Sequence, residues 1–232
     1  MSQSVDYIGG VKFQSAYFES YGLHGLQALA TLIAVAKEHG LQVIMDAKRG
    51  DIGATSLAYA TAYLGDENNA GTAEFSCDYL TVNPLMGDDC LQPFVDVAVE
   101  HNKGIFVLLE TSNPGADMIL KQTLANGKTV NSTIADYIQA QHHQLSIAEG
   151  AFGPIGVVVG ATNPNVAQWR ALLPHSIFLM PGIGAQGGAW DAVKDCLNAN
   201  GEGVMVPISR GITSVAQPVQ SKAEYLHQVQ KN

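Results

Sequence analysis

The sequence predicts an α/β fold, an incomplete (β/α)8 TIM-type barrel. Short apolar runs alternate with longer amphipathic segments along the whole chain, a pattern typical of strands and helices feeding a parallel sheet. The runs are continuously apolar, as expected of strands that are buried on both faces. Polar residues gather directly after several of them, where a barrel of this type carries its active site.

We expect seven strands and seven helices. The strands are predicted at residues 7–13, 41–46, 79–82, 104–109, 155–159, 177–180 and 203–207. The helices are predicted at residues 23–39, 54–63, 90–100, 132–148, 165–172, 189–198 and 221–230. The first predicted strand begins almost at the start of the chain, and seven strands are predicted where a complete barrel has eight. We therefore expect that the first βα unit is missing. Residues 1–232 are expected to form one barrel domain, although a doubly wound open sheet fits the same pattern.

Composition narrows the class of partner. The net charge is −9 with a pI near 5.1, and neither Lys nor Arg is clustered, which argues against nucleic acid and anionic membranes as partners. A small-molecule ligand is therefore expected. Cys77, Cys90 and Cys196 are far apart and in apolar context, so we expect reduced, buried thiols and no zinc site. Without a signal peptide or a run of membrane-spanning length, a cytoplasmic location is expected.

Residues 43–55, VIMDAKRGDIGAT, are the most informative segment of the chain. An apolar strand ends there, and Asp46, Lys48 and Asp51 follow at close spacing. Alternation along a strand would place Asp46 and Lys48 on the same face, about 7 Å apart. Gly50 and Gly53 would let the chain turn into the next helix. This D-x-K-x-x-D pattern predicts an active site; by itself, a solvated turn with an incidental ion pair would also explain it.

Lys12 lies within the first apolar run, where an unpaired charge would be costly to bury. Asp46 on the neighbouring strand is the natural partner. The alternative is a lysine whose amine reaches solvent from the strand edge.

Polar segments also follow the later strands. Residues 81–84 and 110–115 are polar, although ordinary turn chemistry would explain most of this. Residues 181–188, PGIGAQGG, join a strand to a helix and would offer free backbone N–H groups to an anion. Arg210 follows the last strand, and these two loops predict a phosphate-binding site. The histidines lack ligand spacing and are expected on the surface, whereas Trp169 and Trp190 are expected to pack against the outside of the sheet.

With these segments in place, the sequence resembles the orotidine 5′-phosphate decarboxylase family, most closely a bacterial subgroup whose motif reads D-A-K-R-G-D-I-G. The resemblance covers nearly the whole chain, but the family's first strand, which supplies an aspartate to the ribose, has no counterpart here. It implies catalysis by Lys12, Asp46, Lys48 and Asp51. It also implies that Ser112 contacts the base and that Gln186 and Arg210 contact the phosphate. The full set of implied substrate-binding residues is Ile52, Thr55, Asn83, Ser112, Pro181, Gly182, Gln186 and Arg210.

The implied reaction converts orotidine 5′-monophosphate to uridine 5′-monophosphate and CO2, the final step of de novo pyrimidine synthesis, with no metal and no organic cofactor. Lys48 would stabilise charge at pyrimidine C6 and then protonate it, while Lys12 would orient Asp46. The resemblance further implies a homodimer in which Asp51 reaches across into the partner's site.

Two other functions remain open from the sequence. A barrel with the same D-x-K-x-x-D pattern could use Mg²⁺ to stabilise an enediolate from a sugar phosphate, although Lys12 puts an ammonium where a metal would prefer a carboxylate. Because the first strand is missing, the chain could also be a catalytically impaired nucleotide-binding fragment.

Overall fold

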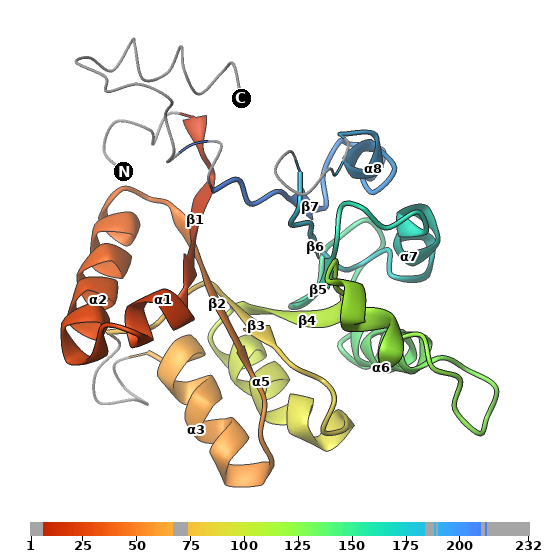
Figure 1. The fold of residues 1–232 in the computed structure, drawn as a ribbon, viewed down its shortest axis with the longest axis horizontal. Coiled ribbons are helices and arrows are strands. Elements are labelled where there is room, and N and C mark those ends of the chain that lie inside the picture. The colour runs from red at the N-terminus through yellow and green to blue at the C-terminus, as the bar shows by residue number, and fades with distance from the viewer. Residues whose placement is uncertain (1–6, 67–73, 184–187, 189, 210–211, 213–232) are drawn as a thin grey trace.

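The structure is a computed structural model that describes residues 7–66, 74–183, 188, 190–209 and 212 (Figure 1). Its strands are β1 (Gly10–Gln14), β2 (Gln42–Arg49), β3 (Tyr79–Val82), β4 (Gly104–Glu110), β5 (Ile155–Val159), β6 (Phe178–Leu179) and β7 (Val204–Met205). Its helices are α1 (Ser15–Glu19), α2 (Gly22–Glu38), α3 (Gly53–Leu64), α5 (Asp88–Glu100), α6 (Val130–Gln144), α7 (Val166–Leu172) and α8 (Trp190–Lys194), with a short 3₁₀ helix, η2 (Pro114–Met118).

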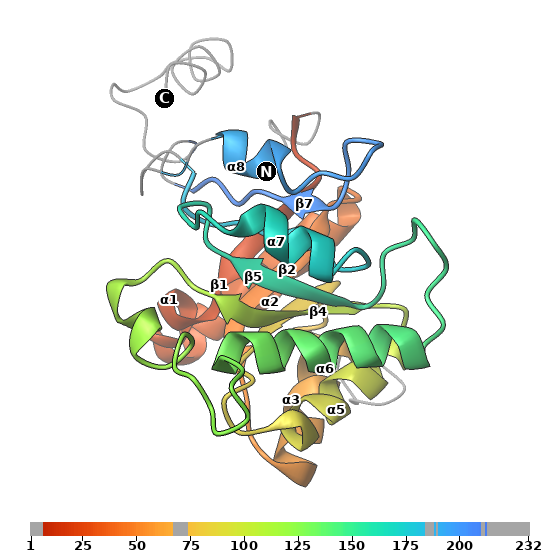
Figure 2. The ribbon, with the colours of Figure 1, turned by 90° about the vertical axis from the view of Figure 1, so that its right-hand side faces the viewer.

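The seven described strands form one parallel sheet in sequence order, from β1 at one edge to β7 at the other. The sheet curls into a half-barrel, and the helices lie on its convex side (Figures 1 and 2). This confirms the predicted α/β barrel class. Because all strands run the same way, their carboxyl ends share one rim, and the side chains that follow those ends can converge.

The core lies between the sheet and the helices. Val43 and Met45 of β2 are fully buried there. Ile44 between them points to the opposite, concave face, where it packs in a smaller cluster with Phe106, Val158 and Leu179. Because side chains alternate along a strand, Asp46 lies on the same concave face as Ile44. The packing of β2 thus directs the first acidic residue of the motif into the barrel interior.

Most predicted elements are present, with shifted ends. The first strand begins at Gly10 rather than residue 7, and β6 and β7 keep only two residues each, because each pairs with its neighbour over only two positions. Two short helices, α1 and η2, were not predicted. The helix expected at 189–198 is confined to Trp190–Lys194, and the one expected at 221–230 falls outside the described residues.

Two side chains differ from their predicted environment. His142, expected on the surface, is 2% exposed, because it lies one turn after Ile138 on the buried stripe of α6. Trp190, expected to pack against the sheet, is 55% exposed, whereas Trp169 is buried as expected. The three cysteines are buried and free, as predicted. No helix in the described ranges is long and apolar enough to span a bilayer.

Candidate active site

Lys12, Asp46 and Lys48 form one cluster on the concave side of the sheet. Lys12 Nζ lies 2.6 Å from Asp46 Oδ2, and Lys48 Nζ lies 2.5 Å from Asp46 Oδ1. A single carboxylate therefore bridges two ammonium groups, which leaves the cluster with one net positive charge. The predicted pairing of Lys12 with Asp46 is present, and Lys12 is not an isolated lysine at the strand edge.

The pairing of β1 with β2 sets this geometry. Lys12 is in register with Ile44, and Gln14 is in register with Asp46. With its amide nitrogen turned toward Asp46, Gln14 donates to Asp46 O (2.6 Å) and Oδ2 (2.9 Å). Gln14 lies two residues after Lys12 on the same face of β1, a spacing by which the sequence could have identified it.

Thr81 of β3 completes the shell around the carboxylate. Its Oγ1 donates to Asp46 Oδ1 (3.0 Å) and accepts from the backbone N–H of Lys48 (2.9 Å). One buried hydroxyl thus holds both the acidic side chain and the backbone of the neighbouring lysine. The sequence placed Thr81 at a strand end but did not single it out.

The backbone at Lys48 is not that of a regular strand. Its φ is +48°, a left-handed value that is uncommon for a residue other than glycine, and the pairing of β2 with β3 shifts register between Met45 and Arg49. The prediction that Asp46 and Lys48 share a face is confirmed in outcome, because the two side chains are paired. Simple alternation along the strand does not account for this pairing, because an irregular strand end turns the Lys48 ammonium back onto Asp46.

The environment of Asp46 favours its charged form. Burial would raise the pKa of this carboxyl, but the charge and hydrogen bond of Lys12, followed by those of Lys48, outweigh burial and hold the pKa below its usual value. Asp46 is therefore an anion at neutral pH. Lys48 keeps 43% of its side chain exposed, so its ammonium remains open to a ligand in the concave face.

Asp51, Ile52 and Thr55 lie where the chain turns from β2 into α3. The Asp51 carboxylate accepts from the backbone N–H of Ile52 (2.8 Å), and the Asp51 carbonyl accepts from the Ser56 hydroxyl. Ile52 and Thr55 are exposed. In the described part of the chain, no hydrogen bond or ion pair joins Asp51 to the Lys12–Asp46–Lys48 cluster.

Two further predicted residues follow β3 and β4 at the same rim. The backbone N–H of Asn83 donates to Arg49 O (2.7 Å), and a Cβ on Gly50 would lie only 2.8 Å from Asn83 O. Ser112 lies against Gly160, where a Cβ would come within 2.8 Å of the Ser112 Cβ. These close approaches require glycine, and they fix the segments that carry Asn83 and Ser112 against neighbouring strand ends.

The candidate phosphate loop begins after β6. Pro181 O accepts from the backbone N–H of Ala161 (2.9 Å), and Gly182 O accepts from the backbone N–H of Gly188 (3.0 Å). Gly182 has a φ of +107°, which only glycine adopts readily. Pro181 and Gly182 therefore lie at the expected rim, while Gln186 and Arg210 fall outside the described residues.

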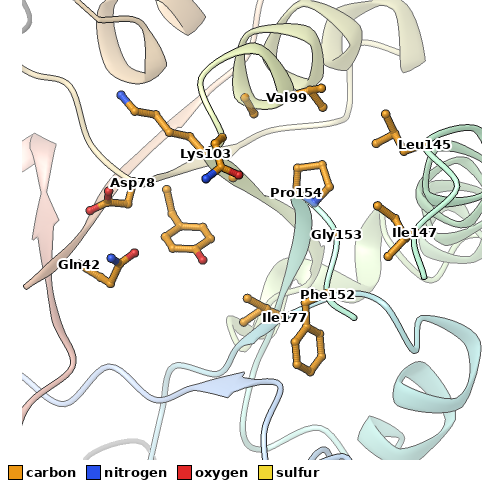
Figure 3. Close-up of a pocket in the computed structure, with 14 residues that line it drawn as sticks. Gln42, Asp78, Val99, Lys103, Leu145, Ile147, Phe152, Gly153, Pro154 and Ile177 are labelled. Atoms are coloured by element: carbon orange, nitrogen blue, oxygen red, sulfur yellow. The ribbon is translucent and has the colours of Figure 1, made fainter. Parts of the chain in front are cut away.

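A cavity of about 710 Å³ lies at the opposite, amino end of the strands (Figure 3). Its charged residues have structural roles: Asp78 accepts from the backbone N–H of Val43 (2.7 Å), and Lys103 donates to Gly65 O (3.1 Å) and to Ser76. The predicted site residues that the structure describes are not among those lining it, and they lie near or after the carboxyl ends of the strands instead.

Comparison with known proteins shows the family of the chain. The sequence profile described as "Orotidine 5'-phosphate decarboxylase / HUMPS family" matches residues 2–225. The chain is 44% identical over 203 residues to orotidine 5′-phosphate decarboxylase of Rhodopirellula baltica, which covers 87% of this chain and 66% of that protein. It is 39% identical over 213 residues to the Deinococcus radiodurans enzyme of the same name, covering 91% of this chain and 74% of the relative.

Among solved structures, Leishmania donovani OMP decarboxylase is similar with a TM-score of 0.76 and 30% identity, covering 99% of this chain and 82% of that one. The likeness extends over both fold and sequence. The chain belongs to the orotidine 5′-phosphate decarboxylase family.

Proposed function

We propose that this chain decarboxylates orotidine 5′-monophosphate to uridine 5′-monophosphate and CO2, as the last step of pyrimidine nucleotide synthesis. The observation that carries the proposal is the Lys12–Asp46–Lys48 cluster, in which an exposed ammonium is held beside a buried carboxylate at the carboxyl rim. The names of the relatives support the substrate, since both curated relatives are orotidine 5′-phosphate decarboxylases.

The chemical problem is the electron pair left on pyrimidine C6 when the bond to the carboxylate breaks. In the proposed reaction, CO2 leaves, the Lys48 ammonium stabilises the developing negative charge and then transfers one proton to C6. The resulting amine regains a proton from solvent, so the site returns to its starting charge. Lys48 suits this role because its Nζ is fixed by Asp46 yet partly open to a ligand.

Asp46 acts on both lysines and on the substrate. Its charged form orients the Lys48 ammonium through one oxygen and receives Lys12 on the other. In the proposed complex, the substrate carboxylate lies against Asp46, and loss of CO2 relieves the repulsion between the two anions. Lys12 balances the charge of Asp46 in the resting enzyme and orients its carboxylate.

Binding of the rest of the nucleotide is assigned to the other strand ends. We propose that Ser112 contacts the base, that Ile52, Thr55 and Asn83 contact the nucleotide, and that the loop from Pro181 to Gly188, with Gln186 and Arg210, binds the phosphate. Very slow reactions require up to about 23 kcal/mol or more of barrier reduction, which no single side chain supplies. Binding energy from the distant phosphate must therefore contribute to catalysis.

We also propose a cytoplasmic homodimer with Asp51 contributed across the interface, so that each site is completed by its partner. The support is that Asp51 stands apart from the cluster of its own chain in the described hydrogen bonds, beside the exposed side chains of Ile52 and Leu57.

The competing Mg²⁺-dependent sugar-phosphate chemistry fits the site less well. Both oxygens of Asp46 are engaged by ammonium groups, so a cation would have to displace Lys12 or Lys48 to bind there. Hard divalent cations prefer several oxygen ligands, and a site flanked by two positive charges opposes their binding.

The deciding experiment follows the loss of orotidine 5′-monophosphate absorbance with the purified chain, with and without EDTA. The expected result is turnover that EDTA leaves unchanged. Lys48→Ala should abolish turnover while uridine 5′-monophosphate still binds in calorimetry. EDTA-sensitive activity on a sugar phosphate would instead establish the metal-dependent chemistry, and nucleotide binding without turnover would establish a non-catalytic binding protein.

A further inference from the structure

The left-handed backbone at Lys48 requires support from its surroundings. Uncommon conformations of this kind persist at functional sites only where neighbouring contacts determine them. The Lys48 N–H bond to Thr81 provides one such contact, and the bond from Asn83 N–H to Arg49 O provides another. Both contacts act on the backbone of the turn.

Arg49 follows Lys48 directly, and its side chain leaves the strand on the convex side. The guanidinium forms an ion pair with Glu19 at the end of α1 and donates from Nη2 to Tyr63 Oη (3.3 Å) in α3. It also lies over the rings of Tyr59 (5.2 Å) and Tyr63 (5.8 Å). These contacts fix one side chain against two helices.

The engagement of Arg49 goes beyond that of an ordinary turn residue. Its side chain is only 25% exposed, and its Nε is buried without a hydrogen-bond partner among the described atoms. A buried donor that makes no hydrogen bond is unfavourable. The guanidinium is therefore held by its Nη2 contacts and by the two rings, with no contribution from Nε.

We propose that Arg49 is a positioning residue for Lys48. The two adjacent side chains point to opposite sides of β2, one to Asp46 and one to the α1–α3 surface. A rotation of the backbone that moved the Lys48 ammonium away from Asp46 would have to withdraw Arg49 from Glu19, Tyr59 and Tyr63. The arginine therefore holds the ammonium in place from the far side of the sheet.

The same ion pair couples the two lysines of the site. Glu19 ends α1, and α1 follows β1, the strand of Lys12, without an intervening residue. The Glu19–Arg49 pair thus joins the element that follows Lys12 to the strand end that carries Lys48. Arginine suits this task because its planar fork can accept an ion pair and lie over aromatic rings at once.

This inference rests on the proposed decarboxylation, and its first test is Arg49→Met compared with Arg170→Met. Arg170 is a matched control because its guanidinium also stacks on a ring, Phe178 at 4.0 Å, and donates to Ser176 O (2.8 Å) and Gly203 O (2.9 Å) near the amino ends of β6 and β7. Both variants lose a half-buried arginine, but only one is next to Lys48.

The expected result is a split between kcat and KM. In Arg49→Met, kcat per folded molecule should fall about 10- to 100-fold, because small displacements of a catalytic group are costly, while KM changes less than about threefold. Arg49→Lys should recover only part of kcat, since it restores the charge without the fork. Arg170→Met should lower the melting temperature and leave kcat per folded molecule unchanged. If Arg49→Met does not fold, the isosteric Glu19→Gln and Tyr63→Phe each remove one contact and should lower kcat in the same sense.

A second readout does not depend on turnover. A lysine-specific endoproteinase should cut after Lys48 faster in Arg49→Met than in the native chain, with no acceleration at this bond in Arg170→Met. If the native chain does not turn over the nucleotide, the proposed function fails and this cleavage rate alone decides the positioning role. Native kcat in Arg49→Met together with an unchanged cleavage rate at Lys48 would overturn the proposal.

Discussion

At the residue scale, the geometry of the site depends on the contacts that hold one carboxylate, that of Asp46. Asp46 receives Lys12 on one oxygen, and Lys48 and Thr81 on the other. A buried carboxylate with fewer partners would take up a proton more readily and would orient the lysine less well. The net positive charge of the cluster also suits a substrate that is proposed to carry both a carboxylate and a phosphate.

Thr81→Val should weaken this arrangement without changing its charge or shape. The substitution leaves the Lys48 N–H without its acceptor and Asp46 without one donor, and an unsatisfied buried polar group costs about 1–3 kcal/mol. We expect the free energy of unfolding in urea to fall by about that amount. We also expect kcat to fall, because the turn at Lys48 loses one of its supports.

Thr31→Val provides the matched control. Thr31 is exposed on α2, where its hydroxyl donates to Gln27 O (3.0 Å) far from the site. Its replacement should change the free energy of unfolding by no more than about 0.5 kcal/mol and leave kcat unchanged. Equal effects of the two substitutions would show that Thr81 has no special part in the site.

At the element scale, the sequence predicted the strands and the common rim of their carboxyl ends well. Continuous apolar runs indicate buried parallel strands because no other element of that length buries both faces, and the residues that follow them necessarily share a rim. Lys12 and Asp46 could be paired in advance because only a partner makes a buried lysine tolerable. These inferences depend on the local residue pattern and on the rule that the carboxyl ends of parallel strands share one rim.

What could not be predicted depends on contacts between elements. The left-handed turn at Lys48 and the role of Thr81 arise from the pairing of β2 with β3, which the sequence does not encode locally. The burial of His142 has another cause: its helix is polar overall, and only the four-residue spacing of Ile134, Ile138 and His142 marks a buried face.

His142 should make the stability of the protein sensitive to mild acid. Its ring lies edge-on to that of His175, with 6.1 Å between centroids, and its Nε2 is buried without a hydrogen-bond partner among the described atoms. Burial, followed by the charge of His175, lowers the pKa of His142 to about 4, although the Ile155 backbone partly opposes this. The folded protein therefore resists protonation at this position.

The sign of the pH effect follows from the two pKa values. His142 binds a proton near pH 6.5 in the unfolded chain and only near pH 4 in the folded chain, so its contribution to stability is constant above about pH 6.5 and is lost as the pH drops between these values. The total loss is about 3 kcal/mol. His142→Gln should remove this component, so that the variant loses less stability than the native chain between pH 7.5 and 5.

The neighbouring His143, which is exposed, serves as the control for that measurement. His143→Gln should follow the native dependence of the urea midpoint on pH. Identical pH dependence of the native chain and His142→Gln would show that the buried imidazole does not titrate as inferred.

At the scale of the whole molecule, the rim that carries the site also carries exposed apolar side chains. Ile52 and Leu57 lie at the start of α3, and Leu85 and Met86 lie between β3 and α5, each exposed by 47–58%. The α3 and α5 helices contact each other, which brings these two segments to one side of the half-barrel. Asp51 precedes Ile52 directly, so a partner subunit that covered this apolar surface would receive Asp51 at its own site.

The proposed exchange of Asp51 can be tested by mixing two inactive variants. Lys48→Ala and Asp51→Asn should each be nearly inactive alone. If Asp51 acts across the interface, a mixed dimer contains one site with both native residues and one with neither. Random exchange of subunits should then restore about a quarter of native activity, because half of the dimers are mixed and half of their sites are intact.

The same mixture separates this arrangement from a site built within one chain. If Lys48 and Asp51 of the same chain acted together, every site in the mixture would lack one of them, and activity would stay at the level of the separate variants. Sedimentation analysis before mixing establishes that both variants are dimers, and Leu57→Glu should weaken association by placing a charge in the apolar surface. Recovery that appears only under conditions of subunit exchange, and that Leu57→Glu prevents, would assign Asp51 to the partner's site, because no rearrangement within a single chain produces that dependence.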